Sequence, residues 1–280
     1  MKIFIRLCII TTILIFCISF SANAVEYHDT LRVGIYYGPS AVNSLTIESY
    51  IGFEIGYSTG RDSNVFEEIS NTSVTVSKNS TDTYHLLYST CESYDELSIK
   101  LSELRELGIN AFPAYFDSSY CAFGGVFASQ NDAQWQAENG SFDAIAVTLP
   151  SSALCITDTK SGNLLFVSDS TSYGVSVFSL DNENPDSLLS ISGSAKGTYR
   201  CGFECRLDSS GALTVVNIVP VESYLYSVVC REMSSSWPVE ALKAQAVCAR
   251  NFALGRINYH KQYGFDICRT VCCQAYSTTA

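Results

Sequence analysis

Basic residues are scarce in this chain: 17 Lys and Arg stand against 28 Asp and Glu in 280 residues, for a formal net charge of −11. Binding to nucleic acid requires clustered Lys and Arg that neutralise phosphates. The composition therefore predicts no nucleic-acid partner and leaves neutral carbohydrate as an acceptable ligand. The 17 Tyr and 15 Phe would suit stacking on sugar faces, although most aromatic side chains in proteins simply fill the core.

Long apolar runs are confined to the start of the chain. Lys2 and Arg6 accompany an apolar run from Leu7 to Phe20, and Ala22-Asn23-Ala24 is a small-x-small cleavage site. This pattern predicts a secretory signal peptide over residues 1–24, with an uncleaved membrane anchor as the alternative. The run is short for a span of roughly 20 residues. We therefore expect an exported protein, located outside the cell, in the cell wall or at the outer face of the membrane.

Cysteine is abundant, with 12 residues in the chain. Two of them, Cys8 and Cys17, belong to the predicted signal peptide. Export makes disulfides feasible, but a chain of this length does not need them, and their pairing cannot be read from sequence. The cysteines of the predicted mature chain are Cys91, Cys121, Cys155, Cys201, Cys205, Cys230, Cys248, Cys268, Cys272 and Cys273.

Alternating strand patterns, separated by clusters of Asn, Asp, Gly and Ser, occupy much of the chain. Residues 25–83 are predicted to form an N-terminal β-segment, and more strands follow after residue 141. We predict an α+β fold with a mainly β-rich body, a C-terminal helical segment that carries the catalytic residues, and a small βαββα insertion. The predicted strands outside that insertion are 31–37, 44–51, 53–57, 143–147, 164–167, 174–178, 188–191, 202–207 and 213–218.

Residues 84–140 differ from the β-rich segments around them, because their pattern predicts helices as well as strands, in the order β-α-β-β-α. The phrase Ser93 to Glu96 is a capping signature before a helix with apolar positions three or four residues apart, and Gly108 ends that helix. A second helix opens at Ser129 to Ala133. These two phrases resemble the SPOR domain, a module that binds peptidoglycan glycan strands stripped of their peptides. The alternative is a small α+β module with a purely structural role.

Two carboxylates, Glu222 and Glu232, flank an otherwise apolar stretch near the C-terminus. The pattern predicts a helix over residues 222–231, a loop at Ser234–Ser236 and a second helix from Pro238. Glu232 would then lie at a helix-to-loop edge beside large apolar side chains, where burial favours the protonated form that a general acid needs. The apolar stripe expected on the second helix is Leu242, Ala246, Ala249, Ala253 and Ile257.

The same stretch resembles the SpoIID/LytB domain of bacterial sporulation and cell-wall proteins. The resemblance predicts a domain of this type over residues 141–280. Because family members usually continue further, we expect the domain to be incomplete at its C-terminal end. The residues that carry the resemblance are Val219-Pro220, Glu222, Tyr224-Leu225, Val228-Val229, Glu232-Met233, Trp237-Pro238, Glu240 to Ala246 and Ala249-Arg250.

The resemblance implies roles for individual residues. In the family, the Glu of the Glu-Met pair is the expected catalytic acid/base, and it falls on Glu232 here; taken alone, Glu232 would be read as a solvated helix-end residue. Glu222 is the second catalytic candidate, with stabilisation of the helix dipole as the alternative. Polar residues of the second helix could line a glycan groove or make packing hydrogen bonds. The expected substrate-binding residues are Lys243, Gln245, Arg250 and Trp237.

A single acid/base residue suffices for a lytic transglycosylase, whereas a hydrolase normally needs two carboxylates that flank the bond. Glu222 and Glu232 lie roughly 80° apart around an ideal helix, so this spacing leaves hydrolysis open. The resemblance predicts cofactor-free cleavage of glycan strands between N-acetylmuramic acid and N-acetylglucosamine. The alternatives are a non-catalytic peptidoglycan-binding protein that stimulates an N-acetylmuramoyl-L-alanine amidase, as attributed to the LytB branch, and a structural component among other spore-envelope proteins.

The last motif combines histidine and cysteine. Phe265 to Cys268 and Cys272 to Tyr276 resemble the family phrase F-D-L-C-x-T-x-H-C-Q-x-Y, where some members bind zinc through His and Cys. Four soft ligands so close in sequence could hold a structural tetrahedral zinc ion, with disulfides as the alternative. Adjacent Cys272 and Cys273 would point opposite ways if they lay on a strand. The predicted metal ligands are His260, Cys268, Cys272 and Cys273.

Overall fold

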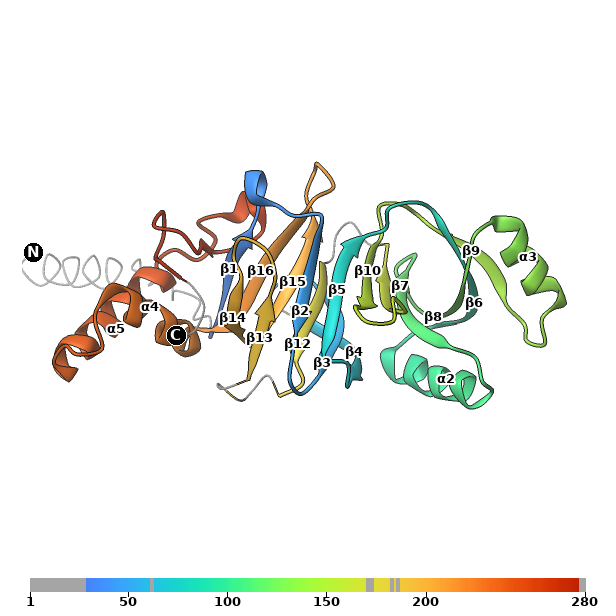
Figure 1. The fold of residues 1–280 in the computed structure, drawn as a ribbon, viewed down its shortest axis with the longest axis horizontal. Helices are drawn as coiled ribbons and strands as arrows, with labels where there is room; N and C mark the ends of the chain where they lie inside the picture. Colours follow the sequence, from blue (N-terminus) through green and yellow to red (C-terminus); the bar gives the residue numbers. More distant parts are fainter. Residues whose placement is uncertain (1–28, 61–62, 170–173, 182–183, 185–186, 277–280) are drawn as a thin grey trace, which may run out of the picture.

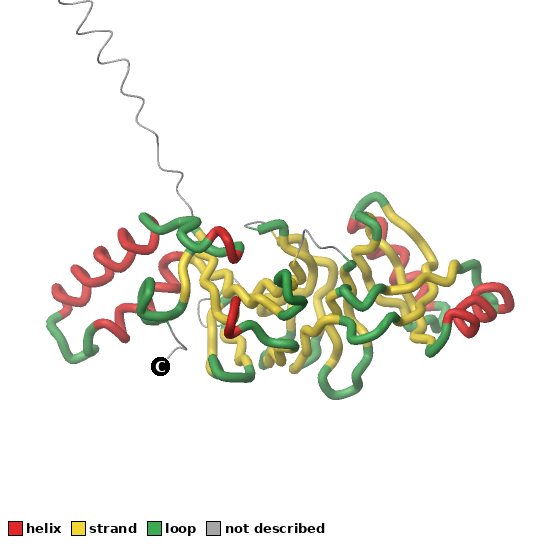
Figure 2. The backbone as a smooth tube through the Cα atoms, turned by 90° about the horizontal axis from the view of Figure 1, so that it is seen from above, coloured by secondary structure: helices red, strands yellow, loops and turns green. Residues whose placement is uncertain are grey.

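The computed structural model describes residues 29–60, 63–169, 174–181, 184 and 187–276. Figure 1 shows a body built of β-strands with helices at both ends, and Figure 2 shows the same arrangement from above. The β-rich α+β class expected from the sequence is confirmed. The predicted signal peptide lies outside the described residues. Within the described ranges, no helix has both the length and the apolar character needed to cross a membrane.

One sheet has seven strands in the order β17-β1-β16-β15-β12-β3-β4. Neighbouring strands are antiparallel except for β1 and β17, which are parallel. The first and last described strands of the chain are therefore neighbours, so the N-terminal segment lies beside the C-terminal motif. The strands are β1 (Thr30–Tyr36), β3 (Phe53–Ser58), β4 (Ser63–Ile69), β12 (Gly174–Ser179), β15 (Gly202–Leu207), β16 (Leu213–Pro220) and β17 (Ile267–Cys268).

The second sheet has ten strands in the order β14-β13-β2-β5-β10-β11-β7-β8-β6-β9. Its neighbouring strands are antiparallel except β11 and β7, which are parallel. The strands of this sheet are β2 (Ser44–Glu48), β5 (Ser73–Lys78), β6 (Thr83–Cys91), β7 (Ala111–Phe116), β8 (Ser119–Phe127), β9 (Ile145–Leu149), β10 (Leu154–Asp158), β11 (Leu164–Ser168), β13 (Leu188–Ile191) and β14 (Gly197–Arg200).

Apolar side chains from both sheets form one main core. On β2 the buried residues Leu45 and Ile47 alternate with more exposed neighbours, as expected for a strand with one face in the core. On the other sheet, Val33, Ile55 and Phe203 are fully buried in the same cluster. Truncating one of the larger side chains to Ala at such positions typically costs about 2–5 kcal/mol. This packed core also includes residues of the C-terminal helices, such as Tyr224 and Ala253.

The segment predicted as β-α-β-β-α has that order and gains one more strand. Helix α2 (Tyr94–Glu106) follows β6, and helix α3 (Gln130–Asn139) follows β8. The predicted caps are present, because Ser93 and Ser129 each accept a hydrogen bond from a first-turn backbone N–H. Strand β9 then pairs with β6, completing a βαββαβ unit with the strand order β7-β8-β6-β9. This unit shares its sheet with the rest of the body through β11.

A helical hairpin extends from the opposite end of the body (Figure 1). Helix α4 (Val221–Glu232) starts directly after β16, and helix α5 (Val239–Leu254) runs back toward the body. The predicted stripe on α5 is buried only in part, since Ala249 and Ala253 are buried but the other stripe residues keep some exposure. The short helices η1 (Gly38–Ser40) and η2 (Lys261–Tyr263) complete the fold.

Candidate functional site

Glu222 and Arg250 join the two helices of the hairpin. Arg250 donates from Nε and Nη2 to the two carboxylate oxygens of Glu222, each at 2.8 Å. This planar two-point geometry suits an arginine–carboxylate pair. The hydrogen bond from Arg250, together with its charge, lowers the pKa of Glu222. Two residues predicted for catalysis and for substrate binding thus bind each other, in the first turn of α4 and near the end of α5.

Glu232 is the last residue of α4, and its side chain is exposed. The partial burial expected from the sequence is therefore wrong. The reason is that residues 234–238, including Trp237, are exposed and form an open connection between α4 and α5 that does not cover Glu232. The carboxylate remains close enough to the body to influence the buried phenol of Tyr224: burial raises the pKa of Tyr224, and charges that include Glu232 add to the effect.

The other predicted substrate-binding residues lie on or near α5. Lys243 forms an ion pair with Glu240 at 2.9 Å, three residues earlier on the same exposed face. Gln245 is half-buried, and Trp237 is 52% exposed in the loop between the helices. They share the hairpin with Glu232, but among the described residues none of them forms a hydrogen bond or ion pair with it.

The four predicted metal ligands converge. The ligand atoms of His260, Cys268, Cys272 and Cys273 all lie within 4.8 Å of one another. The His260 Nε2 atom is 3.3 Å from Cys273 Sγ and 4.0 Å from Cys272 Sγ. A tetrahedral zinc ion places its sulfur and nitrogen ligands ~3.3–3.8 Å apart. The donor set and its spacing therefore fit such an ion after small side-chain movements.

Cys272 and Cys273 do not lie on a strand, so the opposite directions expected of neighbouring strand residues do not apply to them. They lie in a turn closed by the Cys273 N–H, which donates to the Thr270 carbonyl at 3.0 Å. The turn brings both sulfurs to the cluster. None of the ten cysteines in the described part of the chain forms a disulfide.

Two of the four side chains, Cys268 and His260, are shifted toward the forms that bind a metal, whereas burial raises the pKa of the Cys273 thiol to about 11. Burial would raise the pKa of Cys268, but hydrogen bonds from Thr270 and Tyr37 outweigh it, and the pKa lies below its ordinary value. Burial, with the nearby charge of Arg256, lowers the pKa of His260. A thiolate and a neutral imidazole are the forms that bind metals.

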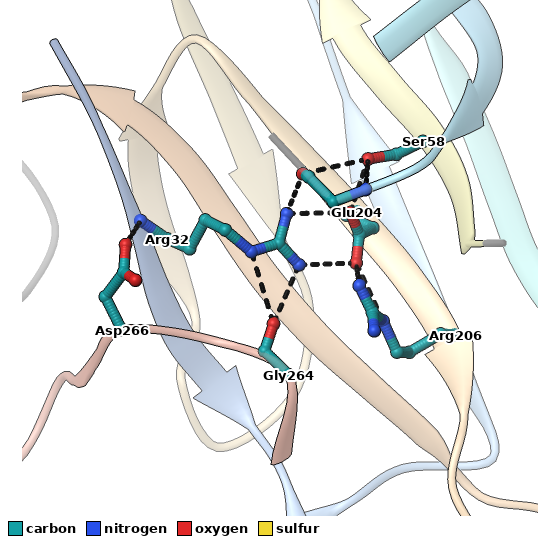
Figure 3. Close-up of polar contacts among 7 residues, drawn as sticks. Arg32, Ser58, Glu204, Arg206, Gly264 and Asp266 are labelled. Atoms are coloured by element: carbon teal, nitrogen blue, oxygen red, sulfur yellow. Dashed lines mark hydrogen bonds and ion pairs between the residues drawn. The ribbon is translucent and has the colours of Figure 1, made fainter. Parts of the chain in front are cut away.

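The loop that carries His260 is tied to β1 through Arg32 and Asp266, as Figure 3 shows. The Arg32 backbone N–H donates to Asp266 Oδ2 at 3.0 Å, and the Arg32 side chain donates to the Gly264 carbonyl from Nε and Nη2. Asp266 Oδ1 accepts from the Asn258 N–H at 3.0 Å. Asp266 is fully buried, so it fixes both ends of the loop without being a ligand.

Glu204 anchors Arg32 from the other side (Figure 3). Arg32 Nη2 and Nη1 donate to the two oxygens of Glu204 at 2.7 and 2.9 Å, and Arg206 and Ser58 also donate to this carboxylate. Burial alone would raise the pKa of Glu204, but these donors and positive charges hold it below its ordinary value. Sequence reasoning missed this network. The available signal was an arginine in the otherwise apolar strand around Arg32.

Comparison with known proteins places all of the predicted site residues in one matched segment. Residues 209–280 match the SpoIID family, described as Stage II sporulation protein. This match supports a protein related to sporulation or the cell wall. An uncharacterised protein of Brachyspira hyodysenteriae is 45% identical over 67 residues, which is 23% of this chain and 18% of that protein. The chain thus spans only a small part of the length of the curated relative that it matches. No solved structure matches it at a significant level.

Proposed function

We propose that this chain is an exported lytic transglycosylase that cuts peptidoglycan glycan strands during sporulation or wall remodelling. The SpoIID match supports the substrate class, and the positions of the two carboxylates support the reaction type. Glu222 and Glu232 lie at opposite ends of α4, so their Cα atoms are about 15 Å apart. In glycoside hydrolases the two carboxyl groups themselves are about 5–9.5 Å apart and both face the bond, whereas the Glu222 carboxylate is turned toward Arg250 on α5. Because Glu222 is bound to Arg250, Glu232 is the candidate of the two that is left for chemistry, and this observation carries the proposal.

A single carboxyl can complete the reaction. Protonated Glu232 gives its proton to the glycosidic oxygen between N-acetylmuramic acid and N-acetylglucosamine, and the bond from that oxygen to C1 breaks. The 6-hydroxyl of the muramic residue then bonds to C1 and returns its proton to Glu232. The product is an anhydro sugar, no water is consumed, and the carboxyl is restored. Closure of a glycan strand over the exposed Glu232 would supply the desolvation that favours its acid form.

The nature of the new chain end tests this reaction. Purified glycan strands without peptides are incubated with the chain, and the fragments are separated and weighed. A lytic enzyme gives anhydromuramyl ends, which lack one water relative to the reducing ends that a hydrolase gives. Reducing ends would contradict the proposal, and so would strands that stay intact while still binding the protein.

We also propose that the His260/Cys268/Cys272/Cys273 cluster holds a structural zinc ion. All four protein ligands come from the chain, so a tetrahedral ion would have no open position for water, which is typical of structural sites. Such an ion would fix the segment after α5 against β1. The proposed reaction needs no cofactor, because every proton in it moves through Glu232.

The second candidate function is a wall-binding protein that stimulates a cell-wall amidase. The exposure of Glu232 favours it, because the described residues do not enclose this side chain in the apolar surroundings that a general acid usually has. The βαββαβ unit would serve either function as a second, SPOR-like glycan contact, and α3 presents Trp135, which is 63% exposed and suited to stacking on a sugar ring. Amidase activity measured with and without this chain distinguishes this function from lytic cleavage.

A further inference from the structure

We propose that Tyr37 is a positioning residue of the metal cluster: its hydroxyl donates a hydrogen bond to the Cys268 sulfur and orients that thiolate toward a bound zinc ion. This inference rests on the zinc site proposed above. Tyr37 lies between β1 and η1, far outside residues 209–280 that match SpoIID. The N-terminal segment would therefore complete a site whose ligands all come from the C-terminal motif.

The ring of Tyr37 is held against the ligand loop by aromatic contacts. Its centroid is 4.8 Å from that of Phe265 in an edge-on contact and 5.2 Å from that of Tyr263. The His260 ring lies at 6.3 Å. Such pairs favour defined ring orientations. The phenol is thus directed by three rings of the loop that carries a ligand, rather than being free to rotate toward solvent.

The Cys268 sulfur is surrounded by donors. The Tyr37 hydroxyl donates to it, Thr270 Oγ1 lies 3.2 Å away, and the Thr270 backbone also donates to it. A metal-bound thiolate keeps lone pairs that accept such bonds, and these partners set its direction and its affinity for the ion. Tyr37 is the one of these partners that comes from a distant part of the chain.

Strand β1 has the geometry to hold Tyr37 in place. Strand β17 pairs with β1 so that Cys268 lies opposite Gly34. A Cβ atom at Gly34 would lie only 2.4 Å from the Phe265 ring, so the absence of a side chain there lets that ring pack directly on β1. The register of β1 shifts between Gly34 and Tyr36, and the Tyr37 ring that follows lies 4.8 Å from the Phe265 ring, beside the cluster.

Zinc affinity and the cobalt spectrum of Tyr37→Phe test the proposal. Zinc affinity is measured by competition with a chromophoric chelator, and the thiolate-to-metal charge-transfer band is recorded after cobalt(II) substitution. We expect about a ten- to hundredfold loss of zinc affinity and a band shifted to longer wavelength, because an unbonded thiolate is easier to oxidise. Tyr36→Phe is the matched control: its hydroxyl bonds to Ser192 and Ala195 instead, so affinity and spectrum should not change.

Each outcome has a distinct meaning. If the wild-type chain binds no zinc, the zinc site and the role of Tyr37 are both overturned, while the lytic proposal is untouched. If the wild type binds zinc and Tyr37→Phe matches it in affinity and spectrum, only the role of Tyr37 is wrong. Should Tyr37→Phe fail to fold, a ring-fluorinated tyrosine at position 37 keeps the packing and strengthens the donor. The band must then move to shorter wavelength, and an unchanged band overturns the proposal.

Discussion

Arg250 donates two hydrogen bonds of 2.8 Å to the carboxylate of Glu222. This pair joins α5 to α4, the helix that ends at Glu232. The pair is partly exposed, with 64% of the Glu222 side chain accessible to solvent. Exposed pairs of this kind contribute about 0.2–1 kcal/mol. Glu222 is therefore better explained as a link within the hairpin than as a second catalytic carboxyl.

Mutation of Glu222 tests whether the Glu222–Arg250 pair is structural or catalytic. Glu222→Gln should lower the free energy of unfolding by at most about 1 kcal/mol. It should reduce the lytic rate far less than Glu232→Gln does, because it removes a helix contact and no proton donor. Urea unfolding and glycan digestion of the two variants provide the comparison. Equal loss of lytic rate in both variants would restore Glu222 as a catalytic residue.

Glu204→Gln should be strongly destabilising. Removing this carboxylate leaves Arg32 and Arg206 without the negative charge that compensates them, and Arg32 is buried. Breaking a buried ion pair in this way costs about 3–5 kcal/mol. The loss is measured as the change in urea-unfolding free energy. Glu240→Gln, which breaks an exposed pair with Lys243, is the control and should cost less than about 1 kcal/mol. Similar losses in both variants would mean that the Arg32 network adds little.

His85 makes stability depend on pH. It is fully buried, and burial lowers its pKa below the ordinary value. Between the folded and unfolded pKa values the unfolded chain binds a proton that the folded chain does not. The stability contribution is thus complete above the unfolded pKa of about 6.5 and declines as pH falls below it. Unfolding free energies at about pH 7.5 and pH 5.5 should differ more for the wild type than for His85→Gln. An equal difference would exclude His85 as the cause.

Removing the proposed zinc ion should loosen the segment that follows α5. A chelator that strips the ion leaves three sulfurs and an imidazole without their common partner, so hydrogen exchange should increase in residues 258–276 while the βαββαβ unit is unaffected. Cys273→Ser should reproduce this pattern without chelator. Unchanged exchange in both experiments would contradict a structural role for the ion.

Local patterns in the sequence were sufficient for the elements whose signals are local. The serine caps at Ser93 and Ser129 and the break at Ser234–Ser236 are found where they were expected, and the four His and Cys side chains expected to converge do lie together. Each depends on residues close together in the chain, where spacing alone determines geometry.

Long-range relationships could not be predicted in the same way. Alternation tells which face of a strand is buried but not which strand is its partner, so the pairing of β17 with β1 was not foreseen. Strands β10, β14 and β17 were not assigned individually, and neither were β4 and β5, although the last two lie within the predicted β-segment of residues 25–83. The exposure of Glu232 depends on the conformation of the loop after α4, which the local sequence pattern does not specify. The Arg32–Glu204 pair joins residues that are 172 positions apart, so no local spacing indicates it.

The central claim, that Glu232 is the acid/base of a lytic reaction, is tested most directly by measuring anhydromuramyl ends released from peptide-free glycan strands by wild type, Glu232→Gln and Glu240→Gln. We predict release by the wild type and by Glu240→Gln, and a loss of at least about a hundredfold in Glu232→Gln, because general acid–base catalysis typically contributes 10²–10⁴-fold. Glu232→Gln that is folded, binds the strands and still releases anhydro ends at the wild-type rate would contradict the claim.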